Sequence, residues 1–401
     1  MKVFIADLFS EEGVKEIKAM GCEVMYDAKV VGDKFKEAVA GFKPNILIVR
    51  SKKVPADVID AFPGLEYIIR AGAGFDKIDV KHASKKGVYV SNCPGKNNIA
   101  VAELAIGLLI CIDRRICEND RYMKEGKFEK GLYANCNGLK GRTLGLLGVG
   151  FVGREVAKRA LAFDIKVLGV DPFICKEDME AMGVTKCDSL EECAKQSDII
   201  SLHLPKLPET EKMINAKFLS LIKPSAVIIN TARADLVVEE DILERLEKNP
   251  EFYYACDVLM GEPAEKKAAF DSKLGKHPKC IATHHIGAST KQAEDAIGKE
   301  AVRMVGEYKK TKLICNCVNL AKDIPKMHIL NVKFENNPTV FPKIIEFAAL
   351  EKIQIENINQ VVFQDRKAIG SAMKFSGEIA NVGEFIEKLK KIPGLIDAAV
   401  L

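Results

Sequence analysis

The sequence carries almost no net charge. Its 60 Lys and Arg residues nearly balance 56 Asp and Glu residues, which leaves a formal net charge of +4. Nucleic-acid-binding proteins concentrate basic residues, so we expect no nucleic-acid partner. Hydrophobic residues make up 48% of the chain and charged residues 29%, and this composition excludes an intrinsically disordered protein. A length of 401 residues is enough for two or three folded domains.

Long hydrophobic runs are also missing. The longest, residues 99–112, contains Glu103 and is shorter than the roughly 20 residues that span a bilayer. We interpret it as a helix of the core. The apolar start of the chain meets Asp7 before it reaches the length of a signal-peptide core, so it predicts a buried first strand. We therefore expect a cytoplasmic protein with no membrane partner.

Cysteine pairs of the kind that hold metal ions are absent. None of the 12 cysteines forms a C-x-x-C pair, and the closest two, Cys315 and Cys317, flank a single Asn. This spacing is poor for a zinc site, and we expect no metal centre. The scattered cysteines fit a reducing compartment, where most would act as small hydrophobic side chains.

What the sequence does contain is two series of short apolar runs that alternate with helical segments. The first series covers residues 2–92 and the second covers residues 142–285. Strands of a parallel sheet are covered on both faces and so form nearly continuous Val, Ile and Leu runs, as these do. We predict two doubly wound parallel sheets of Rossmann or flavodoxin type. Residues 93–95 break the chain, residues 98–112 predict a long apolar helix, and residues 290–309 predict another.

The last 75 or so residues follow a different order. The predicted elements are strand, helix, strand, strand, helix, strand, which is the ferredoxin-like order. The predicted strands are residues 328–336, 354–364, 368–377 and 396–401, and the predicted helices are Val340–Leu350 and Val382–Leu389. We expect a linker at Asp323–Pro325.

A glycine motif opens the second series. Gly148, Gly150 and Gly153 form a G-x-G-x-x-G between an apolar strand and an Ala-rich helix, and the next strand ends in Asp171. In a dinucleotide site these glycines allow a tight turn, close approach of the pyrophosphate, and close packing of helix on strand. Asp171 would bind the adenosine ribose hydroxyls, and no Arg or Lys comes before Lys176, so NAD is favoured over NADP. The alternative is a group of turn glycines with a surface aspartate.

Three ionisable groups follow later strands of the same series. Arg233, Glu262 and the adjacent His284 and His285 come where ligands bind in open α/β sheets. Arg offers a planar fork for a carboxylate, His exchanges a proton near neutral pH, and a carboxylate orients that His. This set suits chemistry on a 2-hydroxy or 2-keto acid. Structural interpretations stay open: Arg233 as a surface cation, Glu262 as a solvated loop residue and His285 as a core histidine.

These residues lie in segments that resemble the D-isomer-specific 2-hydroxyacid dehydrogenases, and the end of the chain resembles an ACT domain. The resemblance is carried by LIVRSKKV (47–54), RAGAGFDKIDV (70–80), NIAVAEL (98–104), LGLLGVGFVGREVA (144–157), SDIISLHLPKLPET (197–210), NTARADLV (230–237), DVLMGEP (257–263), HHIGAST (284–290) and NVKFENNP (331–338). It implies that Arg233 binds the substrate carboxylate, that His285 is the acid/base, and that Glu262 pairs with it. His284 stands where the family usually has proline.

The resemblance implies further contacts. Asp257 would meet the nicotinamide end of the cofactor, and the backbone of Ala73 and Gly74 would receive the substrate carboxylate. Arg50 and Ser51, in a segment typical of the phosphoglycerate branch, would meet a substrate phosphate. Additional cofactor contacts are implied at Phe151, Val152, His203, Pro205 and Thr231.

The implied activity is NAD-dependent oxidation of D-3-phosphoglycerate to 3-phosphohydroxypyruvate, which opens phosphorylated L-serine synthesis. The alternatives are a glyoxylate or hydroxypyruvate reductase and an NAD-sensing regulator. The implied domains are a substrate domain (1–97 plus 286–322), an NAD domain (98–285) and an ACT domain (326–401). We expect a homodimer through the NAD domain and possible tetramers through the ACT domain.

The sequence departs from the family pattern at several positions. Ala234 and Val238 replace the usual glycine and aspartate after the arginine. Family ACT domains bind serine through an H-x-N-x-P-G segment, which here begins at Phe334 and ends at Thr339, and Gln354 replaces a second asparagine. Only Asn336 and Pro338 match that segment. Missing polar partners weaken such sites strongly, so we expect weak serine inhibition or none.

Overall fold

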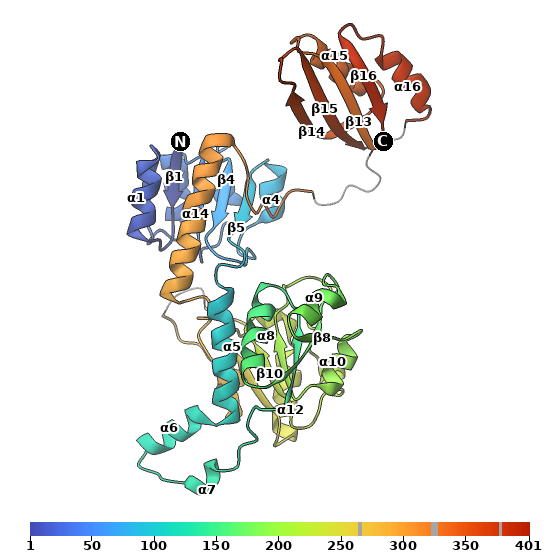
Figure 1. The fold of residues 1–401 in the computed structure, drawn as a ribbon. Coiled ribbons are helices and arrows are strands. Elements are labelled where there is room, and N and C mark those ends of the chain that lie inside the picture. Colours follow the sequence, from blue (N-terminus) through green and yellow to red (C-terminus); the bar gives the residue numbers. More distant parts are fainter. Residues whose placement is uncertain (264–266, 322–327, 377–378) are drawn as a thin grey trace. The chain divides into compact units, whose positions relative to one another are not determined.

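The described residues form three sheets in two compact units (Figure 1). The computed structural model describes residues 1–263, 267–321, 328–376 and 379–401. The units are Met1–Asn319, which holds two parallel sheets, and Leu320–Leu401, which holds one antiparallel sheet. The predicted linker at Asp323–Pro325 lies outside the described residues.

The first parallel sheet and its helices form what we call the first lobe. Its five strands have the order β2-β1-β3-β4-β5 and all pair in parallel. The strands are β1 Lys2–Ile5, β2 Glu23–Tyr26, β3 Ile46–Val49, β4 Tyr67–Arg70 and β5 Tyr89–Asn92. The helices are α1 Glu11–Ala19, α2 Asp33–Phe42, α3 Ala56–Ile59, α4 Val80–Lys85 and, much later in the chain, α14 Lys291–Thr311. Ile297 and Ala301 of α14 pack in one core with Val3 and Ile46, so this late helix belongs to the first lobe.

The second parallel sheet and its helices form the nucleotide lobe. Its seven strands have the order β12-β11-β10-β9-β6-β7-β8. The strands are β6 Thr143–Leu147, β7 Lys166–Val170, β8 Val184–Lys186, β9 Ile199–Leu202, β10 Val227–Asn230, β11 Tyr253–Cys256 and β12 Cys280–Ala282. The helices are α5 Asn98–Asp113, α6 Ile116–Lys124, α7 Lys130–Tyr133, α8 Phe151–Ala162, α9 Lys176–Ala181, α10 Leu190–Gln196, α11 Ala216–Leu219, α12 Glu239–Lys248 and α13 Lys273–Lys276, with a 3-10 turn at Ala234–Leu236.

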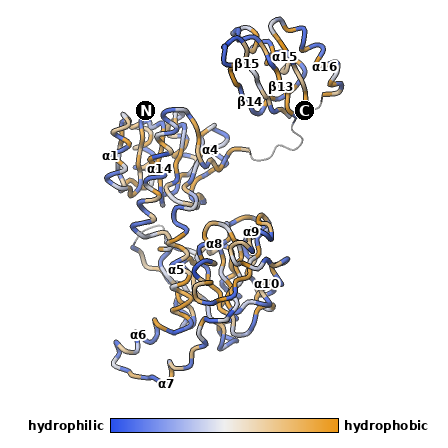
Figure 2. The backbone as a smooth tube through the Cα atoms, viewed as in Figure 1, coloured by the Kyte–Doolittle hydropathy of each residue, from blue (hydrophilic) through white to orange (hydrophobic). Residues whose placement is uncertain are grey.

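Helix α5 explains the longest apolar run of the sequence. Most of its residues are hydrophobic, and Ala102, Ala105 and Leu109 are buried in the core of the nucleotide lobe, whereas Glu103 is exposed. Figure 2 shows the same concentration of hydrophobic residues along the strands of the parallel sheets. The short elements β8, α6 and α7 were not predicted from the sequence, because segments of three to nine residues show little hydrophobic periodicity.

The C-terminal unit is an antiparallel sheet with two helices. Its strands β13 His328–Glu335, β14 Gln354–Val362, β15 Ala368–Ser376 and β16 Leu395–Val400 have the order β14-β15-β13-β16. Helices α15 Val340–Leu350 and α16 Val382–Leu389 begin and end at the predicted residues. Leu330, Phe334 and Phe375 form the core together with side chains of both helices. The predicted fold class, two parallel lobes and a ferredoxin-like domain, is confirmed.

Within the described ranges, no helix is long and apolar enough to cross a membrane.

Candidate active site

The predicted catalytic residues all follow strands of the nucleotide lobe. Arg233 comes three residues after β10, Glu262 comes six residues after β11, and His285 comes three residues after β12. These strands are neighbours in the sheet and run in parallel. Their carboxyl ends therefore meet at one edge, which is where ligands bind in open α/β sheets.

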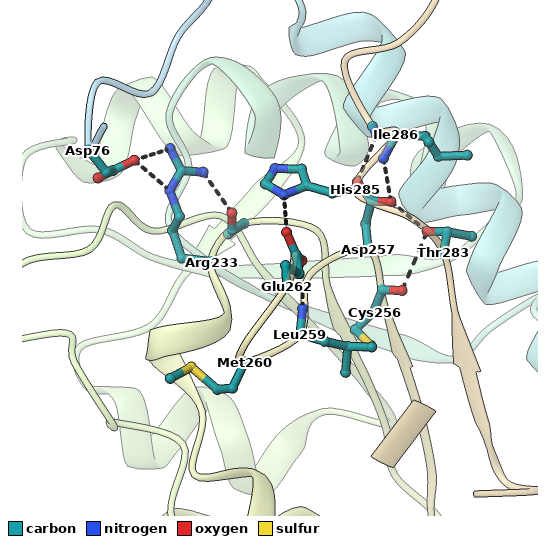
Figure 3. Close-up of polar contacts among 12 residues, drawn as sticks. Asp76, Arg233, Cys256, Asp257, Leu259, Met260, Glu262, Thr283, His285 and Ile286 are labelled. Atoms are coloured by element: carbon teal, nitrogen blue, oxygen red, sulfur yellow. Dashed lines mark hydrogen bonds and ion pairs between the residues drawn. The ribbon is translucent and has the colours of Figure 1, made fainter. Parts of the chain in front are cut away.

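His285 and Glu262 form a hydrogen-bonded pair at this edge (Figure 3). Nδ1 of His285 lies 2.7 Å from Oε2 of Glu262. The other carboxylate oxygen, Oε1, accepts the backbone N–H of Leu259 at 2.8 Å. Burial alone would raise the pKa of Glu262, but the hydrogen bonds from His285 and Leu259 outweigh it and leave this pKa below its usual value. The carboxylate can therefore hold the ring while Nε2 stays free for proton exchange. His284 is exposed.

Asp257 organises the loop that carries His285. Its carboxylate is 2% exposed and accepts hydrogen bonds from the hydroxyl of Thr283 at 2.6 Å and from the backbone N–H groups of Ile286 at 2.8 Å and Gly287 at 2.7 Å. Figure 3 shows the Thr283 and Ile286 contacts. The predicted role of Asp257 toward nicotinamide stays a prediction, since the contacts observed are to the loop that carries His285.

Arg233 is held by a residue that the sequence analysis did not single out. Nε and Nη2 of Arg233 lie 3.1 and 3.0 Å from one carboxylate oxygen of Asp76, and Nη1 donates to the carbonyl oxygen of Ala232 at 2.7 Å. One N–H of Nη1 and one of Nη2 remain, and such a pair matches the two oxygens of a carboxylate. The signal for Asp76 was present, because it lies in the segment 70–80 that carries the family resemblance.

Gly74 leaves room for the Arg233 guanidinium. A Cβ atom at Gly74 would lie 1.9 Å from Nη2 of Arg233 and 3.1 Å from the Asp76 carboxylate. Any side chain at this position would displace the arginine. The structure thus brings Gly74, one of the predicted substrate contacts, to the predicted carboxylate-binding arginine. The neighbouring Ala73 accepts the side-chain amide of Asn92 through its carbonyl oxygen at 2.5 Å.

A second arginine, Arg70, was also missed by the sequence analysis. It ends β4, and its side chain folds over Gly72, where a Cβ would lie 1.6 Å from Nη1. Burial, and then the positive charges of Arg233 and Arg50, lower the pKa of Arg70 to about 10. Within the residues that the structure describes, no carboxylate lies within 4 Å of this guanidinium. Arg70 is thus a partly buried cation beside two others.

Arg50 and Ser51 follow β3 on a loop that Asp7 holds in place. The Asp7 carboxylate accepts the backbone N–H groups of Arg50, Ser51 and Lys52 at 2.6–3.0 Å and the Ser51 hydroxyl at 3.1 Å. Nη1 of Arg50 lies 2.8 Å from a carboxylate oxygen of Glu294 on α14. Contacts from both predicted residues to a substrate phosphate stay predictions.

The three motif glycines have different surroundings. Gly148 has a φ of +95°, and a Cβ there would lie 2.6 Å from the carbonyl oxygen of His203. At Gly153 a Cβ would lie 2.3 Å from the carbonyl oxygen of Gly148, so helix α8 packs closely on β6. A Cβ at Gly150 would meet no described atom within 4 Å. No contact with the described atoms therefore requires glycine at position 150. The open backbone here suits close approach of a pyrophosphate to the N-terminus of α8.

Asp171 lies beside this turn. One of its carboxylate oxygens accepts the backbone N–H of Val149 at 2.9 Å, and the other accepts that of Phe173 at 2.9 Å. A carboxylate offers about four acceptor positions, so some remain for ribose hydroxyls. Both this role and the preference for NAD over NADP stay predictions.

The remaining predicted cofactor contacts lie at the same strand ends. Phe151 and Val152 begin α8, and Phe151 is 63% exposed. Nε2 of His203 lies 2.9 Å from Oγ of Ser201, and burial lowers the pKa of His203 to about 4, so its ring is neutral near pH 7. Pro205 is exposed, whereas the hydroxyl of Thr231 is buried without a hydrogen-bond partner in the described part of the chain. An unpaired buried hydroxyl is costly, and a ligand would satisfy it.

The described ranges contain no group of three or more His, Cys, Asp or Glu side chains arranged to hold a metal ion.

Comparison with known proteins places the chain in a family. Residues 106–287 match the model of the D-isomer specific 2-hydroxyacid dehydrogenase, NAD binding domain. A hydroxypyruvate reductase of Thermotoga maritima is 40% identical over 262 residues, which cover 65% of this chain and 83% of the relative. The chain belongs to the D-isomer specific 2-hydroxyacid dehydrogenase family. It contains the NAD-binding domain of that family, as the glycine motif predicted.

Two other proteins to which the chain is similar are named 3-phosphoglycerate dehydrogenases. A D-3-phosphoglycerate dehydrogenase of Methanocaldococcus jannaschii is 34% identical over 334 residues, which cover 83% of this chain but 62% of the relative's length. The NAD+-bound 3-phosphoglycerate dehydrogenase structure of Entamoeba histolytica has a TM-score of 0.66 and 28% identity, and the match covers 80% of this chain and 99% of that structure. The names of these relatives therefore refer to different compounds, hydroxypyruvate and 3-phosphoglycerate.

Proposed function

We propose that the protein oxidises D-3-phosphoglycerate to 3-phosphohydroxypyruvate with NAD, as the first step of phosphorylated L-serine synthesis. The observation that carries this proposal is the group of three arginines Arg50, Arg70 and Arg233. An isolated buried cation is costly, and Arg70 has no carboxylate partner in the described residues. A substrate with both a carboxylate and a phosphate would neutralise this group, whereas glyoxylate carries a single anionic charge.

The catalytic residues have separate tasks in this proposal. Arg233 binds the C1 carboxylate through its two remaining N–H groups and, in doing so, polarises C2. Nε2 of His285 accepts the proton of the C2 hydroxyl as hydride leaves C2, and it returns this proton when the keto acid is reduced. Glu262 holds the ring through Nδ1 and favours the imidazolium that forms.

The NAD-binding role of the glycine turn is supported by the open backbone at Gly150 and by the unpaired hydroxyl of Thr231. When bound, NAD supplies a nicotinamide ring that accepts the hydride. Gly148, Gly150 and Gly153 would bind its pyrophosphate, and Asp171 would bind the adenosine ribose.

A second candidate is reduction of hydroxypyruvate, favoured by the Thermotoga maritima relative. NADH oxidation with 3-phosphohydroxypyruvate, hydroxypyruvate and glyoxylate separates the candidates. We expect kcat/KM to be highest for the phosphorylated keto acid. Equal or higher values for hydroxypyruvate would overturn the substrate assignment, and no turnover with any of the three would overturn the dehydrogenase proposal.

Variants of Arg70 make this test sharper. Arg70→Met should raise KM for 3-phosphohydroxypyruvate by roughly 10- to 100-fold, the cost of about 1.5–3 kcal/mol for a lost charged hydrogen bond. The same change should alter kcat/KM for hydroxypyruvate less. Arg114→Met, at an exposed arginine that directly follows α5, controls for the lost positive charge. An equal loss for both keto acids would argue against a phosphate contact.

We also propose assembly into dimers through the nucleotide lobe and into tetramers through the C-terminal domain, with the three domains bounded as predicted. Exposed apolar side chains support both contacts: Met123, Phe128 and Leu132 around α6 and α7, and Val361 and Val362 on the edge strand β14. Light scattering of the full chain and of chains with Phe128→Ser or Val361→Lys would show which contact each surface makes.

A further inference from the structure

The backbone of His285 has a conformation that is uncommon for residues other than glycine. Its φ is +53°, in the left-handed region that favours glycine. A non-glycine residue stays there only when the surrounding contacts hold it, and such residues concentrate at functional sites. The hydrogen bond to Glu262 fixes the ring of His285. Something else must fix its backbone.

Asp257 supplies the contacts that hold this backbone. Thr283 lies two residues before His285, and Ile286 and Gly287 follow it directly, so the Asp257 carboxylate binds the chain on both sides of the histidine. The three distances, 2.6–2.8 Å, are those of charge-assisted hydrogen bonds. Oδ1 accepts two of these bonds and Oδ2 accepts one.

The burial of Asp257 away from any cation makes this arrangement unusual. The side chain is 2% exposed, and within the described residues no Lys, Arg or His nitrogen lies within 4 Å of its carboxylate. A buried carboxylate without a cation is expensive unless hydrogen bonds satisfy it. Gly287 allows the loop to lie close to this carboxylate, because a Cβ atom at Gly287 would be 3.0 Å from Oδ2 of Asp257. The loop is therefore shaped around this one carboxylate.

We propose that Asp257 is a positioning residue, which holds His285 in its left-handed conformation so that the ring reaches both Glu262 and the substrate. This inference rests on the proposed function of His285 as the acid/base. It differs from a cofactor contact, which would act on NAD binding. Oδ2 keeps one acceptor position, so a weak contact with the cofactor remains compatible with the positioning role.

The first experiment compares Asp257→Asn with the wild-type enzyme. An amide has one acceptor oxygen and an NH2 group that cannot accept the N–H groups of the loop, so the loop should loosen. We expect kcat to fall by roughly 10- to 10³-fold, within the loss expected for a misplaced acid/base. The Kd of NADH, measured by fluorescence, should change by less than about threefold, as should KM, because neither depends on a proton-transfer group.

A pair of milder variants keeps the inference testable if Asp257→Asn does not fold. Thr283→Val removes one hydrogen bond to Asp257 at nearly constant shape, whereas Thr283→Ser keeps the hydroxyl. We expect the valine variant to lose kcat by roughly 3- to 30-fold and the serine variant to stay near wild type, since only the valine variant loses the hydrogen bond to the carboxylate. Equal activity of the two variants would contradict the inference.

The decisive measurement is a double-mutant cycle with His285→Ala. If Asp257 acts through the histidine, Asp257→Asn should cost little further activity once the imidazole is gone. Effects that multiply, or a loss of NADH affinity beyond tenfold with kcat unchanged, would overturn the positioning role and assign Asp257 to the cofactor.

Amide hydrogen exchange separates this inference from the proposed function. The N–H groups of Ile286 and Gly287 should exchange slowly in the wild type and at least tenfold faster in Asp257→Asn, whatever the enzyme's substrate. Unchanged exchange would refute the role of Asp257 even in an active dehydrogenase. Faster exchange in a protein without turnover would refute the proposed function and keep the loop contact.

Discussion

Nδ1 of His285 lies 2.7 Å from Oε2 of Glu262, and the second oxygen of the same carboxylate accepts the N–H of Leu259. Both oxygens of Glu262 are thus engaged, one by the ring and one by the backbone after β11. The glutamate cannot turn away without breaking the second bond. The ring orientation of His285 is therefore built into the loop that carries the glutamate.

Replacing Glu262 with Gln should keep the fold and impair proton transfer. The pKa of Glu262 lies below its usual value, so the native side chain is ionised at neutral pH and favours a protonated ring. An amide lacks that charge. We expect kcat for keto-acid reduction to fall by roughly 10- to 10³-fold, part of the 10²–10⁴ expected for general acid/base catalysis. The acid form should also be available only at lower pH, so the pH profile of reduction should shift to lower pH. An unchanged profile would separate Glu262 from the proton transfer.

The two adjacent histidines should differ sharply. His285→Ala should lower kcat by roughly 10²- to 10⁴-fold, because it removes the proposed acid/base. His284→Ala should cost far less, since it is His285 whose ring lies 2.7 Å from Glu262 (Figure 3). Steady-state rates with 3-phosphohydroxypyruvate and NADH measure both. The reverse order would mean that the wrong histidine has been assigned.

Asp171 should decide the choice between NAD and NADP. A 2′-phosphate near its carboxylate would meet like charge, and we expect the wild type to prefer NADH over NADPH in kcat/KM. Asp171→Ser should narrow this preference by roughly tenfold or more, which is about 1.4 kcal/mol. The variant also loses the acceptors for the N–H groups of Val149 and Phe173, so its melting temperature must be measured alongside. Equal use of both cofactors by the wild type would contradict the assignment.

Asp7 should stabilise the first lobe in a pH-dependent way. Burial would raise the pKa of Asp7, but hydrogen bonds from Ser51, Arg50 and Lys52 outweigh it and leave this pKa below the ordinary Asp value of 3.8. A lowered folded-state pKa adds stability that is present above the unfolded pKa and is lost as pH falls through the folded pKa. Asp7→Asn should therefore cost about 1–3 kcal/mol at pH 7.

The same difference should be smaller at pH 3 than at pH 7, because pH 3 lies below the ordinary Asp pKa of 3.8 at which the unfolded chain binds a proton. Urea unfolding at both pH values measures it. Asp57→Asn is a matched control, because Asp57 is exposed and pairs only at 3.6 Å with Lys36, a surface contact of little energetic value. A pH-independent difference between Asp7→Asn and wild type would contradict this account.

Serine should bind weakly to the C-terminal domain. Phe334, which stands where the serine-binding segment has histidine, is 1% exposed and stacks on Phe341 at 5.7 Å between ring centroids. The side-chain amide of Asn336 donates to the carbonyl oxygen of Arg366 at 2.7 Å. Titration calorimetry with L-serine should show no micromolar binding, and activity should persist in millimolar serine. Micromolar binding with lost activity would show that the substitutions are tolerated.

The fold could be predicted from the sequence because its signals are local. Continuous apolar runs, the glycine motif and the helices Val340–Leu350 and Val382–Leu389 depend on residues within about 20 positions of one another. The short helices α6 and α7 were not predicted, because segments of four to nine residues without a buried face show no hydrophobic periodicity. The family resemblance also singled out Arg233, Glu262 and His285, whose roles stay predictions.

The tertiary structure alone decided how these groups are held. Asp76 is 157 positions from Arg233, and the Asp7 carboxylate is 44 positions from the Ser51 N–H that it accepts. The left-handed backbone of His285 depends on Asp257, which follows a neighbouring strand. A hydrogen bond between distant positions depends on strand order and register, which bring separate strand ends to one edge of a sheet. No local pattern of residues encodes that distance, and so these partners could be found only after the chain was folded.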